Sequence, residues 1–250
     1  MRVFGVSDVH VDYQANLDWV AALSKQDYQQ DAVLVAGDLS HDMALTQRCL
    51  ALLQERFADV LFVCGNHDLW VKRRDPIDSL EKFHLLQKTL QAQGVAQQPL
   101  YRPQVSLVPL QSWYDYSFGE PDTKLRNLWM DYRRCRWPQH WEPADVAAQF
   151  RQMNPQPNLR PQVPCITLSH FMPRMDLLPP VAVEHFGFLL PILGSQALDQ
   201  ELRLHQPQIH LYGHSHVNVD KTIDGVRYVN NARGYPKEPR HEYRRLLQLL

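Results

Sequence analysis

The sequence has little that would point to an oxidising environment. Its 250 residues contain four cysteines, and none of these lies in a C-x-x-C pair. Cys64 and Cys165 stand in apolar stretches of strand length. We therefore expect buried free thiols and a reducing compartment, with a cytoplasmic location as the default.

The sequence also lacks a surplus of either charge and a long uninterrupted apolar stretch. The formal net charge is −1, which argues against a dedicated nucleic-acid-binding protein, because such proteins usually carry a basic surplus. The N-terminus leads directly into a strand-like segment, without the apolar region of a signal peptide. Residues 179–194 form the most apolar later segment, but Glu184, His185 and three prolines interrupt it, so we expect no membrane span.

The first half of the chain contains a regular alternation of strand and helix patterns. Apolar runs at 2–6, 32–36 and 60–64 alternate with segments of helical spacing at 16–26, 43–57 and 79–93. We expect Ser79 to cap the last helix and Gly94 to end it. The alternation predicts an α/β fold. The absence of polar alternation within the strands indicates that both of their faces are covered.

Similar patterns occur in the second half. Strands are expected at 105–110, 163–168 and 208–212, a helix capped by Ser195 at 195–206, and a hairpin of 217–223 and 226–229 around Asp224-Gly225. We expect the tail, 236–250, to dock on the body as a helix or a strand. The length allows residues 1–250 to form one domain.

An insertion rich in aromatic residues and proline, at about 111–164, interrupts this regularity. We predict irregular structure there. Its tryptophans and tyrosines are typical of a satellite apolar cluster under long loops. A cap over a functional site is compatible with that packing role, and both interpretations stay open.

Small polar clusters follow five of the expected strands. They are Asp8 and His10, Asp38, Asn66-His67-Asp68, His170, and His214 and His216. One such cluster alone is an ordinary polar turn. However, the carboxyl ends of parallel strands form the edge at which α/β sheets bind ligands. Five clusters in the same phase therefore predict one functional site.

The ligand types in these clusters indicate metal. Imidazoles with carboxylates suit manganese, iron or zinc, and seven side chains (Asp8, His10, Asp38, Asn66, His170, His214 and His216) are too many for one tetrahedral ion. Two ions that share a carboxylate would fit. Because Asp8 and Asp38 are the only carboxylates among these ligands, two divalent ions leave a positive surplus. A bridging hydroxide and an anionic substrate would balance that surplus, and this favours a phosphate ester.

In order and spacing, the motifs Asp8-Val-His10, Gly37-Asp38, Gly65-Asn66-His67-Asp68, Ser169-His170 and Gly213-His214-Ser215-His216 resemble those of the calcineurin-like metallophosphoesterase superfamily. The resemblance implies a four-layer αββα sandwich with a dinuclear metal site at the carboxyl ends of the strands. It assigns Asp8, His10, Asp38 and His216 to one ion and Asp38, Asn66, His170 and His214 to the other. It further implies that His67 faces the substrate and that Asp68 orients His67.

The resemblance implies hydrolysis of a phosphate ester by metal-activated hydroxide. Gly37-Asp38 continues as Leu39-Ser40-His41-Asp42, without the arginine-bearing segment of the Ser/Thr protein phosphatases, and Asp68 stands where they usually have glutamate. The pattern is closer to the phosphodiesterase and small-molecule branches. A phosphomonoesterase or phosphoprotein phosphatase, and a non-catalytic interaction module on the same fold, remain as alternatives. Lys72, Arg73, Arg74, Arg174 and Arg233 are additional candidates for binding a substrate phosphate.

Overall fold

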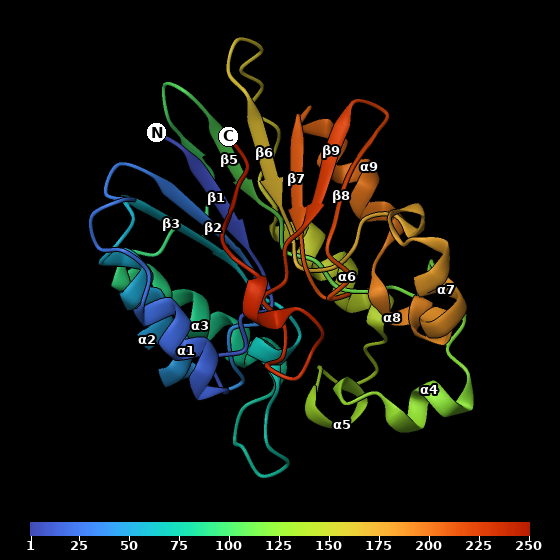
Figure 1. The fold of residues 1–250 in the computed structure, drawn as a ribbon. Helices are drawn as coiled ribbons and strands as arrows, with labels where there is room; N and C mark the ends of the chain where they lie inside the picture. The colour runs from blue at the N-terminus through green and yellow to red at the C-terminus, as the bar shows by residue number, and fades with distance from the viewer.

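Two β-sheets lie face to face and helices cover their outer faces (Figure 1). The computed structural model describes residues 1–250. The smaller sheet has the order β10-β1-β2-β3, with β10 Leu247–Gln248, β1 Val3–Val6, β2 Ala32–Ala36 and β3 Asp59–Val63. The larger has the order β4-β5-β6-β7-β9-β8, with β4 Leu100–Tyr101, β5 Ser106–Pro109, β6 Cys165–Leu168, β7 Ile209–Tyr212, β9 Val226–Asn230 and β8 Val219–Ile223. This arrangement confirms the predicted αββα sandwich.

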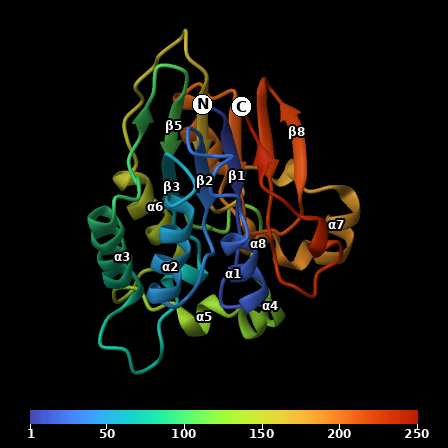
Figure 2. The same ribbon diagram turned by 60° about the vertical axis from the view of Figure 1, so that its left-hand side comes forward.

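The longer helices form the two outer layers, and shorter ones gather below the strand ends (Figures 1 and 2). The outer helices are α1 Gln14–Ala21, α2 Met43–Gln54 and α3 Ser79–Gln93 on the smaller sheet, and α6 Pro143–Met153 and α9 Gln196–Leu204 on the larger. The short ones are α4 Thr123–Leu128, α5 Asp131–Arg134, α7 Pro180–Phe186 and α8 Leu190–Leu193, with the 3-10 turns η1 His67–Leu69, η2 Met175–Leu177, η3 Gly187–Leu189 and η4 His241–Tyr243. None of the helices combines the length and the apolar character that crossing a bilayer requires.

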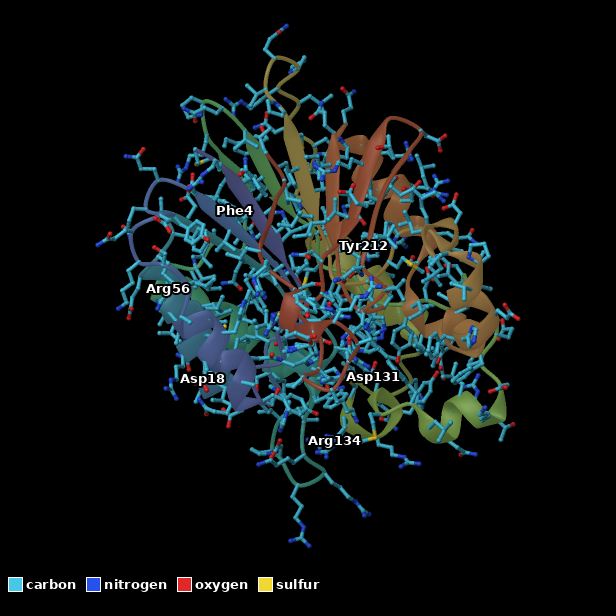
Figure 3. All side chains as sticks on the ribbon, in the orientation of Figure 1. Phe4, Asp18, Arg56, Asp131, Arg134 and Tyr212 are labelled. Carbon is cyan, nitrogen blue, oxygen red and sulfur yellow. The ribbon has the colours of Figure 1, made fainter.

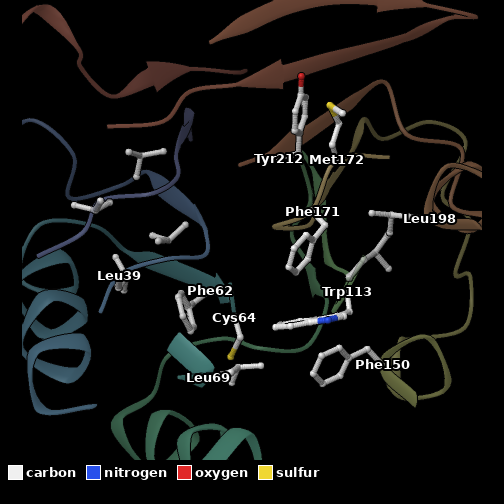
Figure 4. Close-up of a cluster of buried hydrophobic side chains, with 14 of the residues drawn as sticks. Leu39, Phe62, Cys64, Leu69, Trp113, Phe150, Phe171, Met172, Leu198 and Tyr212 are labelled. Atoms are coloured by element: carbon white, nitrogen blue, oxygen red, sulfur yellow. The ribbon is translucent and has the colours of Figure 1, made fainter. Parts of the chain in front are cut away.

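The strands are buried on both faces, as the sequence predicts. In β2, Ala32, Leu34 and Ala36 belong to a cluster of 14 buried residues between the two sheets. Val33 and Val35 point the other way, into a cluster of 43 buried residues that includes the inner faces of the helices. Figure 4 shows part of this second cluster, with Trp113, Phe150 and Phe171 packed together. Because side chains alternate along a strand, each of the central strands contributes to both clusters.

The cap predictions need two corrections. The cap of α3 is Asp78, not Ser79, because the Asp78 carboxylate accepts from the Glu81 amide while the Glu81 carboxylate accepts from the Asp78 amide. Ser195 stands at the start of α9, but its hydroxyl donates to Asp115 rather than capping the helix. Gly94, with φ 83°, does end α3.

The segment 111–164 is more regular than predicted, since it contains α4, α5 and α6. Their starts carry local signals that outweigh the proline content: Asp122 caps α4, and Pro143 occupies the first turn of α6. The hairpin around Asp224-Gly225 is confirmed, with φ values of 48° and 82° at these two residues. The tail docks as a strand, because β10 pairs with β1.

Candidate active site

The five polar clusters meet at the carboxyl ends of β1, β2, β3, β6 and β7. Asp8, His10, Asp38, His214 and His216 all have left-handed backbones, with φ values of 51°, 46°, 56°, 67° and 53°. Such values are uncommon for residues other than glycine and cost conformational energy. These tight turns carry the chain out of β1, β2 and β7 and turn the side chains toward a common centre.

Two glycines allow the strand ends to approach so closely. A Cβ on Gly65 would lie 2.2 Å from Oδ1 of Asp38, and one on Gly213 would lie 2.6 Å from Oδ2 of Asp8. Both distances are far below a van der Waals contact, so any side chain at these positions would displace a carboxylate of the site.

The first group of converging atoms comes from His170, His214, Asn66 and Asp38. Nδ1 of His170 lies 2.9 Å from the carbonyl oxygen of Ala36, and Nε2 of His214 lies 3.0 Å from that of Ile192. A carbonyl only accepts, so these ring nitrogens carry the protons. The opposite nitrogens, Nε2 of His170 and Nδ1 of His214, therefore present lone pairs to each other at 3.2 Å.

Two oxygens join these nitrogens. Oδ1 of Asn66 is 3.1 Å from Nε2 of His170, and Oδ2 of Asp38 is 3.5 Å from the same atom. Nitrogen and oxygen lone pairs this close repel one another unless a proton or a cation lies among them. The donor set therefore fits a metal ion, and Asp38, His170 and His214 lie close enough together to hold one.

The second group is formed by Asp8, His10 and His216, which could also hold an ion. Nε2 of His216 lies 3.2 Å from Oδ1 of Asp8 and 3.2 Å from Nε2 of His10. On its other side, Nδ1 of His216 is 2.6 Å from Oε1 of Glu238. Burial opposes protonation of His216, but the charges of Asp8 and Glu238 and their hydrogen bonds outweigh it and raise its pKa to about 9.

Asp38 lies between the two groups. Burial raises the pKa of this carboxyl well above its usual range, and the nearby carboxylates of Asp8 and Asp68 raise it further. Without counter-charge this group would favour its neutral form. A cation on either side would reverse that preference, which is the electrostatic requirement for a shared carboxylate.

His67 occupies the open side of the centre. Its ring stacks on Trp70 with centroids 3.7 Å apart and meets the ring of His10 at 4.8 Å. Its Nε2 is 3.9 Å from Oδ2 of Asp38, and 16% of its side chain remains exposed. Burial, with the neighbouring charge of His170, lowers the pKa of His67 to about 3.

A cavity of about 600 Å³ opens beside this centre. Asp38, Asn66, His67, His214 and His216 line its polar side. Trp129 also lines it and brings the 111–164 segment to the site, whereas Trp113 and Tyr114 of that segment are buried in the core. The segment therefore both packs and contributes to the cavity wall.

Comparison with known proteins identifies the family. The model of the calcineurin-like phosphoesterases matches residues 1–218. The chain belongs to this family. It is accordingly a hydrolase of phosphoric esters, as the motifs predicted, and it carries Asp/His clusters able to bind metal.

Two comparisons concern PptH of Mycobacterium tuberculosis. The chain is 26% identical over 260 residues to the acyl-carrier-protein phosphodiesterase PptH of strain ATCC 25618 / H37Rv, covering 94% of this chain and 78% of that protein. The crystal structure of the phosphopantetheinyl hydrolase PptH from Mycobacterium tuberculosis superposes with a TM-score of 0.80 at 24% identity, covering 100% of this chain and 95% of the other. The second likeness shows a shared fold.

In this phosphoesterase, Asp68 does not pair with the imidazole of His67. Its carboxylate accepts backbone N–H bonds from Asp38, Leu39, Ser40 and Gly65, at 2.8–3.2 Å. The expectation that Asp68 orients His67 is therefore wrong at the level of direct contact. Asp68 instead ties the turn after β2 to the turn after β3, because those donors have no partner within a strand.

Two carboxylates that the sequence reasoning missed, the buried Asp131 and the half-buried Glu238, hold the clusters in place. Asp131 accepts from Nδ2 of Asn66 at 2.9 Å and from the indole nitrogens of Trp70 and Trp129 at 2.6 and 2.8 Å. Glu238 contacts His216, and its other oxygen accepts from Arg244 at 2.8 Å. The available signal for Asp131 was an acidic residue among aromatic ones in the 111–164 segment. The tail offered no comparable signal for Glu238.

None of the basic residues predicted as candidates for binding a substrate phosphate lines the cavity. Arg174 forms ion pairs with Asp176, Asp199 and Asp224. Arg233 is buried, and its Nη1 donates to the carbonyl oxygens of His241 and Arg244. Lys72, Arg73 and Arg74 do not line the cavity beside the metal-binding groups. The polar side of that cavity is therefore formed mainly by the motif residues.

Proposed function

We propose that this chain is a phosphodiesterase that works with two metal ions. Asp8, His10, Asp38 and His216 would hold one ion, and Asp38, Asn66, His170 and His214 the other, with Asp38 shared. The observation that carries this proposal is the convergence of unprotonated nitrogens and oxygens at 3.1–3.5 Å around Nε2 of His170. Nitrogen and oxygen donors of this kind suit manganese, iron and zinc.

When bound, such ions activate water and neutralise charge on a phosphate. The chain's own residues supply orientation. His67 lines the cavity and is held by its stacking on Trp70. From there it can donate a hydrogen bond to the leaving oxygen of the ester or to the phosphoryl group, where charge develops as the bond breaks. Asp131 and Glu238 keep Asn66 and His216 turned inward.

The choice of a diester rests on the relative from Mycobacterium tuberculosis, which is named a phosphodiesterase of acyl carrier protein. The similarity extends over 94% of this chain, and the fold of the Mycobacterium tuberculosis PptH structure is shared over 100% of it. We extend that substrate class to this chain. Its substrate would be the phosphodiester through which a phosphopantetheinyl group is attached to a carrier protein.

The test is a substrate panel assayed with each metal. The metal-free protein is loaded separately with manganese, iron(II) or zinc and given bis(p-nitrophenyl) phosphate, p-nitrophenyl phosphate or an acyl carrier protein that carries phosphopantetheine. We expect the aryl diester to be cleaved faster than the monoester, and the carrier protein to lose its arm, as followed by intact mass. Asp38→Asn, which weakens the shared ligand, is the inactive control. Preferential hydrolysis of the monoester would contradict the proposal.

A further inference from the structure

The cavity beside the metal-binding groups has a second wall of a different character. Besides the motif residues, its lining includes Leu178, Ala182, Phe186, Leu189 and Leu193. They belong to the segment that includes α7, η3 and α8, between β6 and α9 (Figure 1). We propose that the ester hydrolysed here carries an extended, uncharged apolar substituent that lies along this wall. The inference rests on the proposed function for the position of the phosphate.

The wall is joined to the metal-binding groups. The carbonyl of Ile192, in α8, lies 3.0 Å from Nε2 of His214, and Leu193 follows directly. On the other flank, Trp129 lies edge-on to the ring of His214 with centroids 5.7 Å apart. A substituent on a phosphate bound at the metal-binding groups would therefore meet apolar atoms immediately beyond His214.

Part of this wall is open to solvent. The side chain of Phe186 is 54% exposed although it lines the cavity. Ala182 and Leu193, which also line the cavity, are buried. Exposed aromatic surface in a concave site is typical of a ligand contact. An apolar ligand that covers this surface removes it from water, which is energetically favourable. A cavity of about 600 Å³ is in the range that encloses small-molecule ligands.

The charges of the lining disfavour a second anionic group at the apolar end, because none of the five apolar residues there can pair with it. Apart from the histidines, Arg244 is the only cationic side chain among the lining residues. Its Nη1 is already engaged, since it donates to Oε2 of Glu238 at 2.8 Å and to the carbonyl of Arg233 at 3.0 Å. Through Glu238, Arg244 is linked to His216 on the side of the metal-binding groups, and the apolar residues of the wall have no charge of their own. This favours an ester with a chain-like substituent over a polyphosphate.

The test uses p-nitrophenyl phosphodiesters whose second substituent is methyl, butyl or octyl, below their micelle concentrations, with the manganese-loaded enzyme. From the transfer of a methylene out of water we expect kcat/KM to rise about two- to fourfold per methylene between methyl and butyl. Phe186→Ser and Leu189→Ser should flatten this dependence. Val181→Ser is the matched control, because Val181 is on α7 but is 60% exposed and lies outside the cavity; it should keep the full dependence.

A binding measurement separates this inference from the proposed function. Calorimetric titration compares methylphosphonate with octylphosphonate, and we expect the octyl compound to bind at least tenfold tighter, with a negative change in heat capacity. If diesters are cleaved at rates independent of chain length and the two phosphonates bind equally, the apolar wall has no such role and the phosphodiesterase assignment stands. If octylphosphonate binds tighter but no diester is cleaved, the wall is supported and the phosphodiesterase assignment fails.

Discussion

The carboxylate of Asp131 accepts a hydrogen bond from Nδ2 of Asn66 at 2.9 Å, and this contact decides which end of the Asn66 amide faces the metal-binding groups. With Nδ2 engaged, Oδ1 points toward Nε2 of His170, 3.1 Å away. Figure 3 labels Asp131 below the lower ends of the strands. The 111–164 segment thus reaches the site through the buried carboxylate of Asp131 as well as through Trp129, which lines the cavity.

Asp131→Asn should weaken metal binding at the Asn66 group. An amide in place of the carboxylate would be a weaker hydrogen-bond acceptor for the side chains of Asn66, Trp70 and Trp129. Loss of contacts that orient a metal ligand typically lowers metal affinity about 10- to 100-fold. Metal titration with a competing chelator measures the affinity, and tryptophan fluorescence reports the change around the two indoles. Asp122→Asn is the control, since Asn caps a helix as well as Asp does. Unchanged affinity in Asp131→Asn would contradict the positioning role.

Glu238→Gln should weaken the other group selectively. Glu238 lies 2.6 Å from Nδ1 of His216, so its charge fixes the ring with Nε2 directed at Asp8. Loss of that charge should lower the affinity for one ion by about 10- to 100-fold and leave the second ion bound. Metal content per chain after dialysis distinguishes one ion from two. Glu242→Gln changes an exposed side chain of the same tail and should retain both ions. Loss of both ions from Glu238→Gln would show that the groups are not independent.

His67→Ala should retain both ions and lose about 10²- to 10⁴-fold in kcat on the aryl diester. The reason is that His67 lies on the open side of the centre and lines the cavity, where it would contact the substrate rather than bind a metal ion. Metal analysis and steady-state kinetics on the same preparation provide the comparison. His41→Ala removes a neighbouring, more exposed imidazole and should change kcat little. A variant that lost an ion along with His67 would assign this residue to the metal instead.

Asp68→Asn should act on the fold of the site rather than on His67. The amide oxygen of the new side chain can still accept some of the four backbone N–H bonds. The NH2 group of the same amide, however, would face the remaining backbone donors of the turns after β2 and β3. Buried donors left unsatisfied cost roughly 1–3 kcal/mol, so we expect the free energy of unfolding to fall by about 3 kcal/mol. Urea denaturation of the metal-free protein measures it. Full stability with lost activity would instead favour a direct catalytic role for Asp68.

The stability of the protein should decrease in acid partly through His210. This imidazole is buried between the hydroxyls of Thr167 and Ser169, 2.8 and 3.1 Å away, and burial lowers its pKa to about 3. The unfolded chain takes up a proton below about pH 6.5, whereas the folded chain does so only near the lowered pKa. The contribution to stability is therefore complete above pH 6.5 and decreases as the pH falls toward 3, by up to about 1.4 kcal/mol per pH unit.

Urea denaturation of the metal-free protein at pH 7.5 and pH 4.5 tests this dependence. His210→Gln, which has no titrating ring, should lose about 2 kcal/mol less than the wild type between the two pH values. His84→Gln removes an exposed imidazole of α3 and serves as the matched control; it should follow the wild type. Identical pH dependence in the wild type and His210→Gln would contradict the assignment.

Most of the fold could be predicted because its signals are local. An apolar run such as Ala32–Ala36 forms a strand wherever it is buried on both faces, and that strand has the predicted bounds. The motif residues could also be predicted, because each directly follows its strand and parallel strands present their carboxyl ends at one edge. The caps were harder: Ser79 and Asp78 are both good caps, and the choice depended on the reciprocal bond with Glu81.

The sequence by itself determined the family motifs, the alternation of strands and helices, and the residues that converge on the site. Only the tertiary structure decided how those residues are held. Asp131 and Asn66 are 65 positions apart, and Glu238 reaches His216 because the tail folds back over the strand ends. Asp68 serves two turns rather than its neighbour His67 because unpaired backbone N–H groups lie closer to it. Contacts of this kind depend on distance in space, which the spacing of residues along the chain does not specify.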